Sequence, residues 1–512
     1  MLRRLCMLVH VQIRTRSPMS SLAGGDAAMP RNPALTVLPT VLLAMGIAVS
    51  DQAMVATALP GLIGELGGVE LISWVFVATL MTSTLAAPVY GRLGDMLGRR
   101  RMLVLALCLF VCGAALCALA WRIEALIAAR AFQGIGAGGL MTLSQALIGQ
   151  TVPPRERGRF QGYIAAMQLC ATTAGPILGG LVAHFLGWRL VFVISLPAVV
   201  LALGLSVLLP KGQPADKREP FDLPGLVFFA ASVVPVLLSI HFLKRFDAAS
   251  LPLALTLFGG AACALALLVR RERIAPAPLF PVELMRQAAI WRCDLIAACH
   301  GASMIALVAF VPIYLRAAKG MGAAEIGLML LALTGGAGIG TMATGRMVTR
   351  TGRTMLFPSL GLSLGGATVL MLGLASPHLG ALHLPWVLAW FSICGGTVMG
   401  VLQIVVQHTA GPKHIGAAAG TVQFSRSLGG AIGTSIVGAA LFAALSASDP
   451  EAARVFVDML TSGPGVLDEL AETQRARVQA GVADAFLAAF LVVVGFQWIG
   501  AALAWSVPSR RI

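Results

Sequence analysis

The sequence is poor in charged residues. Asp, Glu, Lys and Arg make up only 12% of its 512 residues, about half of their share in a typical soluble domain. A chain with so few charges cannot cover a water-exposed surface of normal size, which excludes a string of soluble domains. Hydrophobic residues make up 58% instead and run nearly from end to end, so we expect a single polytopic membrane domain.

Several signatures of catalysis are also missing. The nine cysteines form no Cys-x-x-Cys pair and no metal-ligand spacing, so we expect no metal site. No Gly-x-x-x-x-Gly-Lys-Ser/Thr phosphate loop is present, which argues against ATP as an energy source. Because no nucleophile–base constellation stands out either, we predict that the chain is not an enzyme and needs no cofactor.

Acidic residues are scarcer than basic ones, and the formal net charge is +15. In a soluble protein this excess would suggest nucleic acid. Here 26 of the 37 Lys and Arg lie in the two termini and in alternate loops between apolar runs, and only nine lie in the opposite loops. This asymmetry follows the positive-inside rule. The charge therefore indicates a multi-pass topology with both termini in the cytoplasm, and no nucleic-acid partner.

Fourteen apolar runs are long enough to span a bilayer, which takes roughly 20 residues. They are 34–60, 71–90, 102–121, 125–150, 160–186, 188–209, 223–243, 250–269, 294–315, 325–345, 354–375, 384–408, 415–446 and 485–507. We predict two six-helix bundles, at 34–210 and 294–507, joined by a linker with two inserted helices at 211–293. The second bundle includes an external loop at about 446–484. A basic cytoplasmic arm (1–33) and a cytoplasmic tail (508–512) form the two ends. A start at Met19 or Met29 is an alternative to the arm.

A short basic loop joins the second and third runs. It reads Gly91-Arg-Leu-Gly94-Asp95-Met-Leu-Gly98-Arg99-Arg100-Arg101. Its arginines can bind anionic lipid headgroups, and Asp95 is placed to meet the positive end of a helix dipole or nearby arginines. A weaker copy, Gly345 to Arg353, joins the tenth and eleventh runs. This repeat indicates two related halves separated by the inserted pair.

Asp51 and Arg130 are charged residues inside apolar runs, where a charge costs at least a few kcal/mol on insertion scales and so indicates function. Asp51 belongs to Asp51-x3-Val-x2-Ala-Leu-Pro, and Arg130 to Arg130-x2-Gln-Gly-x-Gly. Burial favours the protonated form of a carboxyl group, whereas an arginine keeps its charge. A structural, hydrogen-bonded aspartate and an arginine that reaches the outer interface are the alternatives.

The fifth run contains Gly162-x8-Ala171-x3-Gly175-Pro176-x2-Gly179. Small residues at this spacing allow helices to approach closely, and the proline removes a backbone hydrogen bond and bends the helix. Taken alone, the pattern indicates packing only.

Together these motifs, in this order, resemble the major facilitator superfamily, in particular its fourteen-helix drug:proton antiporter family of the quaternary-ammonium and multidrug exporter type. The resemblance covers about 34–507, with Ala171 in place of one family glycine and Ser195 where the family often has asparagine. It implies an all-α integral membrane fold of two six-helix bundles plus two inserted central helices. It also assigns roles: proton coupling to Asp51 and Arg130, a conformational latch to Gly91, Asp95, Gly98, Arg99 and Arg100, and an antiporter helix to Gly162, Gly175, Pro176 and Gly179.

The resemblance further implies a monomeric, proton-coupled exporter of small amphipathic compounds such as drugs, dyes or biocides. Its partners would be a small-molecule substrate, protons and membrane lipid, and its place the bacterial inner membrane. A dedicated carrier of one metabolite is the alternative, and a membrane enzyme or sensor is a third, less supported, reading. The tenth run offers only Glu325 at its edge, which argues against dication export. Candidate cavity residues are Trp74, Gln145, Gln168, His300, Gln403, Gln407 and Gln423.

Overall fold

The computed structural model describes residues 33–68, 71–209, 221–243, 251–276, 278–280, 282–375, 380, 382–462 and 472–508. The predicted arm, except Pro33, and the tail, except Pro508, lie outside these ranges, as do parts of the predicted linker and external loop. The described residues are overwhelmingly helical. Their helices are α2 (Pro33–Leu66), α3 (Ile72–Leu97), α4 (Arg99–Ala118), α5 (Ile123–Thr151), α6 (Arg157–Leu186), α7 (Trp188–Val193), α8 (Leu196–Ser206), α9 (Leu223–Leu243), α10 (Leu251–Glu272), α11 (Val282–Met285), α12 (Ala288–Ala317), α13 (Ala323–Thr351), α14 (Leu356–Ala375), α15 (Leu384–Gly396), α16 (Met399–Ala410), α17 (Ile415–Ser448), α18 (Pro450–Ser462) and α19 (Glu472–Ser506).

Thirteen spans in the described part of the chain are long and apolar enough to cross a membrane. The apolar helix α9, which packs against α10, accounts for the remaining predicted run. Two predicted runs are each divided into two helices. The run 188–209 breaks between α7 and α8 just before Pro197, which suits the first turn of a new helix. The run 384–408 breaks between α15 and α16 after Gly395 and Gly396.

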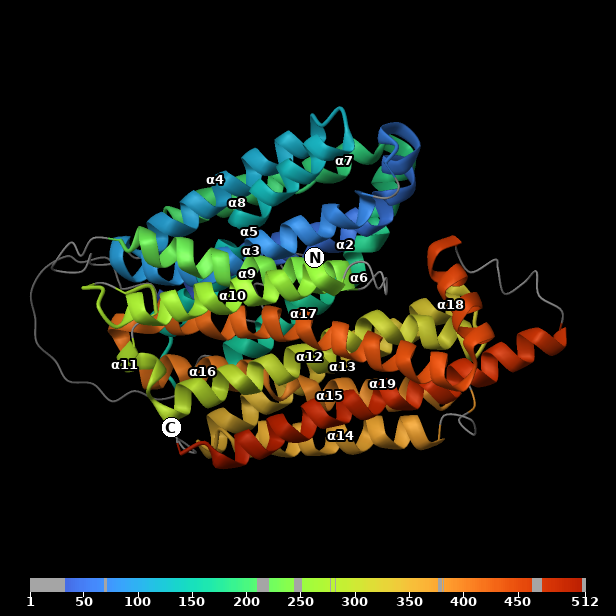
Figure 1. The fold of residues 1–512 in the computed structure, drawn as a ribbon. Coiled ribbons are helices and arrows are strands. Elements are labelled where there is room, and N and C mark those ends of the chain that lie inside the picture. The colour runs from blue at the N-terminus through green and yellow to red at the C-terminus, as the bar shows by residue number, and fades with distance from the viewer. Residues whose placement is uncertain are drawn as a thin grey trace, which may run out of the picture.

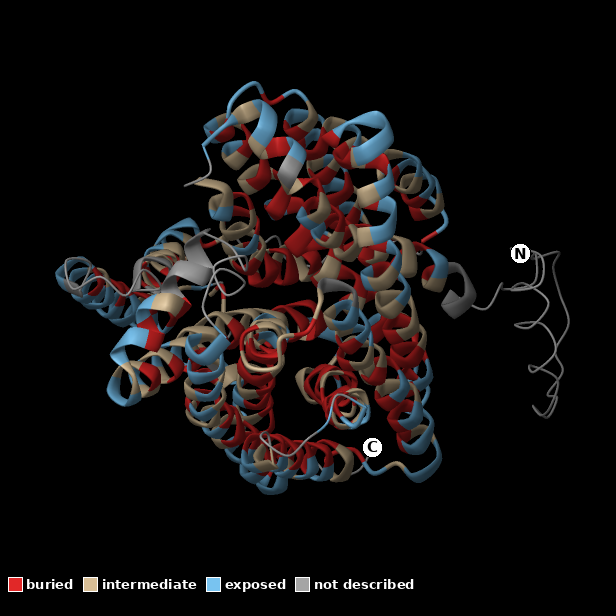
Figure 2. Cartoon of the chain, turned by 90° about the vertical axis from the view of Figure 1, so that its right-hand side faces the viewer, coloured by how far each residue is buried: buried red, intermediate tan, exposed pale blue. Residues whose placement is uncertain are grey.

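The helices form two groups that lie side by side (Figure 1). α2 to α8 make one group and α12 to α19 the other, while α9 packs against both α3 and α17, where the groups meet. Buried residues gather in the interior of each group and exposed residues on its outside (Figure 2). The exposed residues include large apolar ones such as Phe185, Leu186 and Trp386. Large apolar side chains on the outside of the helices fit a surface that faces lipid rather than water.

The predicted basic loop is almost entirely helical. α3 runs through Gly91 and Asp95 to Leu97, and α4 begins at Arg99, so Gly98 alone separates the two helices. Gly98 has φ of 98°, which side chains with a Cβ rarely adopt. Gly352, its counterpart in the sequence repeat, likewise has a positive φ and ends α13. A glycine with a positive φ therefore lies at this turn in each half: it stands alone between α3 and α4, and it is the first residue of the longer link between α13 and α14.

The same repeat places glycines where the two groups of helices meet. A Cβ at Gly91 of α3 would collide with the carbonyl oxygen of Gly416 in α17, and a Cβ at Gly345 of α13 would collide with that of Gly158 in α6. Gly91 and Gly345 occupy equivalent positions of the repeat. Both contacts lie on the side that carries the basic residues, which is the predicted cytoplasmic side. The groups thus touch there backbone to backbone.

The predicted external loop at about 446–484 contains a short amphipathic helix. Within it, α18 occupies Pro450–Ser462, and α19 begins at Glu472. Ala452, Ala453 and Phe456 of α18 pack into the core of the second group. Asp449 caps α18: its Oδ1 accepts hydrogen bonds from the backbone N–H groups of Glu451 and Ala452, and Arg477 of α19 donates to its Oδ2 at 2.8 Å.

We predict that Asp449→Ala loosens α18. The Ala452 N–H above all, and then Arg477, hold the pKa of Asp449 below its ordinary 3.8, so the cap stabilises α18 above that pH and is lost as the pH falls through the lowered value. At pH 7, amide hydrogen exchange in 450–462 should become several-fold faster in the variant, because Asp-to-Ala replacement removes an N-cap. Asp484→Ala, an exposed acid of α19, is the control. Equal exchange rates in all three proteins would contradict the assignment of the cap.

Candidate functional site

A buried ion pair connects α2 and α5 inside the first group of helices. Arg130 Nη1 donates to Asp51 Oδ2 at 2.7 Å and to Gln133 Oε1 at 2.6 Å, and Gln133 Nε2 donates to Asp51 Oδ1 at 3.0 Å. Asp51 is 4% exposed, and Arg130 and Gln133 are 0% exposed. The three side chains close a ring of hydrogen bonds that is sealed from solvent. Arg130 therefore does not reach the outer interface.

The surroundings of the pair are apolar on several sides. The Arg130 guanidinium carbon lies 5.7 Å from the centre of the Phe192 ring of α7, and Cys117 of α4 donates weakly to Gln133 at 3.5 Å. Arg130 Nε and Nη2 have no hydrogen-bond partner in the described part of the chain. An arginine so placed depends on the Asp51 carboxylate for compensation, because leaving a buried charge unpaired costs about 3–5 kcal/mol. Gln133 belongs to the quoted motif, but the sequence analysis assigned it no role.

The glycines of α6 press against the turn of α2 that contains Asp51. A Cβ at Gly175 would lie 2.8 Å from the Ala53 Cβ, and a Cβ at Gly179 would lie 2.8 Å from the Met54 Cα. Gly162 faces α13 instead, where its Cβ would lie 3.3 Å from the Met342 Cα. Pro176 lies inside the same helix. The expected antiporter helix thus contacts the Asp51 helix on one side and the second group on the other.

Asp95 of α3 caps a helix that belongs to the other group. The first residues of α17 have N–H groups without a partner in their own helix, and two of them find one in Asp95. Gly416 N donates to Oδ1 at 2.9 Å and Ala417 N donates to Oδ2 at 2.8 Å. Arg99 Nη2 also donates to Asp95 Oδ1, at 2.6 Å. A carboxylate at a helix N-terminus is further stabilised by the helix dipole, so Asp95 fastens the two groups together.

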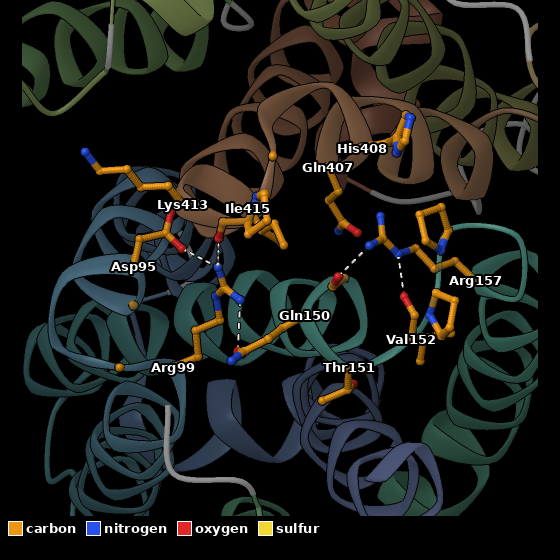
Figure 3. Close-up of a pocket in the computed structure, with 17 residues that line it drawn as sticks. Asp95, Arg99, Gln150, Thr151, Val152, Arg157, Gln407, His408, Lys413 and Ile415 are labelled. Atoms are coloured by element: carbon orange, nitrogen blue, oxygen red, sulfur yellow. Dashed lines mark hydrogen bonds and ion pairs between the residues drawn. The ribbon is translucent and has the colours of Figure 1, made fainter. Parts of the chain in front are cut away.

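Arginines extend this junction across the basic side of the molecule (Figure 3). Arg99 Nη1 donates to Gln150 Oε1 at 2.9 Å, and Arg157 donates to the carbonyl oxygens of Gly149 and Val152 at the end of α5. They line a pocket of about 630 Å³ with Asp95, Gln407 and Lys413. Arg100 points elsewhere and donates to the Leu209 carbonyl oxygen.

A second cavity lies between the two groups, and α2, α5, α6, α12, α13, α15, α16 and α17 all contribute to it. Of the predicted cavity residues, Gln145, Gln168, His300, Gln403 and Gln423 line it. Gln407 lines the pocket beside Arg99 instead, and its Nε2 donates to the Gln145 carbonyl oxygen at 3.1 Å. Trp74, half-buried near the start of α3, is absent from the lining that the described residues form.

The cavity also contains residues that the sequence analysis did not propose. They are Gln161, Arg426, Thr341 and four methionines, namely Met45, Met141, Met304 and Met399. A charged residue inside an apolar run was the available signal for Arg426, but methionines in such runs look like ordinary core. The cavity measures about 120 Å³, less than the roughly 300–1,000 Å³ of typical ligand sites, so a bulky compound needs the groups to move apart.

Comparison with known proteins agrees with this architecture. Residues 41–434 match the family model described as "Major Facilitator Superfamily". The chain belongs to the major facilitator superfamily. It is 32% identical over 508 residues to the "Uncharacterized MFS-type transporter Rv1877" of Mycobacterium tuberculosis, covering 96% of this chain and 72% of that protein. It is 29% identical to the "Multidrug transporter protein MdtP" of Bacillus subtilis, covering 78% and 74%.

Solved structures of major facilitator proteins share the fold. The human organic anion transporter MFSD10 superposes with a TM-score of 0.65 at 18% identity, covering 93% of this chain and 100% of that one. The proton:xylose symporter XylE gives 0.58 at 15% identity, covering 94% and 98%. The predicted all-α major facilitator fold is therefore confirmed, and the chain is a multi-pass membrane transporter of small molecules rather than an enzyme.

Two adjacent glycines of α6 allow a matched test of the contact with α2. We predict that Gly179→Ala lowers thermal stability by about 1–3 kcal/mol, because its Cβ would overpack the Met54 backbone. Gly180→Ala should be neutral or slightly stabilising, since nothing lies within 4 Å of its Cβ and alanine favours helix. Thermal unfolding of the purified transporter in detergent measures both. Equal stabilities of the two variants would contradict the described packing.

A second prediction concerns the junction at Asp95. Asp95→Ala removes the acceptor of two α17 N–H groups and of Arg99, charge-assisted bonds worth about 1.5–3 kcal/mol each, so the two groups should separate more often on this side. Gln407→Cys, buried at this junction, should then react with a maleimide about ten-fold faster, in a background without the native cysteines. The exposed Glu156→Ala is the control. An unchanged labelling rate would show that Asp95 does not hold the junction closed.

Proposed function

We propose that this transporter is a proton-coupled exporter of small amphipathic compounds, in which Asp51 binds the transported proton. The observation that supports it most strongly is the sealed Asp51–Arg130–Gln133 ring, which pairs a titratable group with a permanent charge within the membrane-spanning helices. Ionisable groups inside membrane helices are expensive and usually belong to ion or proton pathways.

Protonation of Asp51 would cancel the attraction to Arg130. Gln133 can still accept a hydrogen bond from Arg130, so the arginine keeps one partner while α2 loses its electrostatic tie to α5. Both helices line the central cavity, through Met45 on α2 and through Gln145 on α5. A change in their relative position therefore alters the cavity, although Asp51 itself is not among its lining residues.

The contacts of α6 extend this coupling to the second group of helices. Gly175 and Gly179 press on the Asp51 turn, and Gly158 and Gly162 meet α13 on the opposite side. A shift of α2 thus reaches α6 and then α13, without any element between them. The Asp95 junction opposes separation on the predicted cytoplasmic side, so we assign the present closed arrangement on that side to a state that faces outward.

The driving energy would come from the proton gradient, with no other cofactor. The membrane potential alone supplies about 2.3 kcal/mol per charge per 100 mV. We further propose that the transporter acts as a monomer in the plasma membrane with both termini in the cytoplasm, in line with the positive-inside asymmetry. The similarity to the multidrug transporter protein MdtP of Bacillus subtilis supports export of diverse compounds rather than of one metabolite.

Proton release from inverted membrane vesicles tests the proposal. Vesicles energised by respiration receive a panel of lipophilic cations, neutral drugs and weak acids, and the internal pH is followed by a fluorescent reporter. We predict that Asp51→Asn reduces substrate-induced proton release at least about ten-fold, because an amide cannot carry the proton that a carboxylate binds. Asp484→Asn, an exposed acid of α19, should behave as the wild type.

Two outcomes would contradict the proposal. Proton release that persists in Asp51→Asn would exclude Asp51 as the proton site. A panel in which no compound differs from empty vesicles would weigh against an exporter of many compounds and in favour of a dedicated metabolite carrier.

A further inference from the structure

The cavity between the two groups contains one permanently charged side chain, and its charge is positive. Arg426 of α17 lies in the wall together with His300 of α12. The other polar side chains of the wall are five glutamines and one threonine. No aspartate or glutamate occurs in this wall as the described residues form it. The electrostatic potential inside the cavity is therefore positive.

Among the described residues, no neighbouring carboxylate neutralises the charge of Arg426. Within the described ranges no carboxylate forms an ion pair with it, and its Nε lacks a hydrogen-bond partner. His300 is 4% exposed, and its Nδ1 has no partner there either. Buried polar groups are normally hydrogen-bonded, so two such groups in the wall of one cavity point to a ligand that completes them.

Two buried acids of the described helices, Asp51 and Asp294, do not compensate Arg426. Asp51 is bound to Arg130 and lies outside the cavity wall. Asp294 lies six residues before His300 on α12, about 9 Å along the helix axis, and it is buried outside the wall as well. Neither carboxylate is in a position to hold a cation inside the cavity.

Close packing fixes where Arg426 stands. A Cβ at Gly301 of α12 would collide with the Arg426 carbonyl oxygen, and a Cβ at Gly429 would lie 2.5 Å from the Ala298 Cα. α12 and α17 therefore touch backbone to backbone at Arg426 and again three residues farther along α17. The guanidinium is presented to the cavity by a rigid pair of helices, as a preorganised binding group requires.

We infer that the preferred substrates are amphipathic organic anions, whose acidic group binds at Arg426 and His300. This inference rests on the proposed function, because it concerns the cavity of the same exporter. A guanidinium binds carboxylates and sulfonates through two parallel hydrogen bonds. The apolar part of the substrate contacts Met45, Met141, Met304 and Met399, side chains flexible enough to fit varied shapes.

Binding of two probes with one skeleton and opposite charges tests the inference. The probes are 2-naphthalenesulfonate and 2-naphthyltrimethylammonium, measured by equilibrium dialysis against the full chain in nanodiscs of neutral lipid, with empty nanodiscs subtracted. The sulfonate should bind at least about ten-fold more tightly than the ammonium, because a like charge in a cavity of low dielectric is strongly repelled. Arg426→Gln should abolish this preference, and Arg426→Lys should retain part of it.

A gain of charge gives a test that does not depend on removing Arg426. Gln423→Glu places a carboxylate in the same wall with little change of volume, so it should weaken sulfonate binding and strengthen ammonium binding. Gln479→Glu, the same substitution at the outer end of α19, should leave both affinities unchanged. A wild-type preference for the ammonium, equal binding of both probes, or a sulfonate preference that survives Arg426→Gln would each overturn the inference.

The probes separate this inference from the proton-coupling proposal. Binding is measured at equilibrium without a pH gradient, whereas the vesicle assay measures Asp51-dependent proton release. If cations or neutral drugs release protons through Asp51 and the sulfonate does not bind, the proposal of a proton-coupled exporter is supported and the inferred preference for anions is wrong. If the sulfonate binds through Arg426 and no compound releases protons, the assignment of anion binding to the cavity is supported and the proposal of proton coupling through Asp51 is wrong.

Discussion

A carboxylate and a guanidinium inside a bundle of apolar helices are stable only together, and this constraint organises the first half of the transporter. Asp51 and Arg130 are 79 residues apart in the chain, on helices that must stay adjacent as long as both groups are charged. Gln133 supplies a further partner to each of them, and the glycines of α6 bring a third helix against the same turn. Any proton that reaches Asp51 changes the balance of the whole contact, because it removes one charge and leaves the other.

The contact between the two halves depends on a different feature, namely glycines that have no side chain to keep the helices apart. Glycines in α3, α6, α13 and α17 let backbones touch, and the single carboxylate of Asp95 caps a helix of the opposite half. Such a junction needs no large apolar interface, so a few hydrogen bonds decide whether it is closed. If the exported compound is an anion, one proton moving inward and one monoanion moving outward transfer charge in the same direction. The membrane potential would then favour both movements, at about 2.3 kcal/mol per charge per 100 mV.

Much of the fold was predictable because the bilayer leaves so few solutions. Apolar runs of about 20 residues can only be helices there, so the spans appear close to their predicted positions. The helix breaks before Pro197 and after Gly396 were missed, because an apolar run has the same hydropathy whether or not the helix is interrupted within it. α18 was missed for another reason: its apolar residues are interspersed in the sequence with Glu451 and Arg454, so it forms no apolar run. The structure shows that Ala452 and Phe456 enter a core.

The candidate site was predictable where the residue type was itself unusual. Asp51, Asp95 and Arg130 stand out because charge is scarce in this chain, and the repeat of Gly91 and Gly98 at Gly345 and Gly352 indicates two related halves. The sequence by itself therefore determined the approximate positions of the spans, the division into two halves and the charged residues that need partners. Only the tertiary structure decided which partners they have, because the partners lie on helices far away in the chain. Gln133 joins Asp51 and Arg130, the N-terminus of α17 meets Asp95, and Arg426 has no ion-pair partner among the described residues. Close approach between such helices depends on the shape of both surfaces, and a linear pattern describes only one of them at a time.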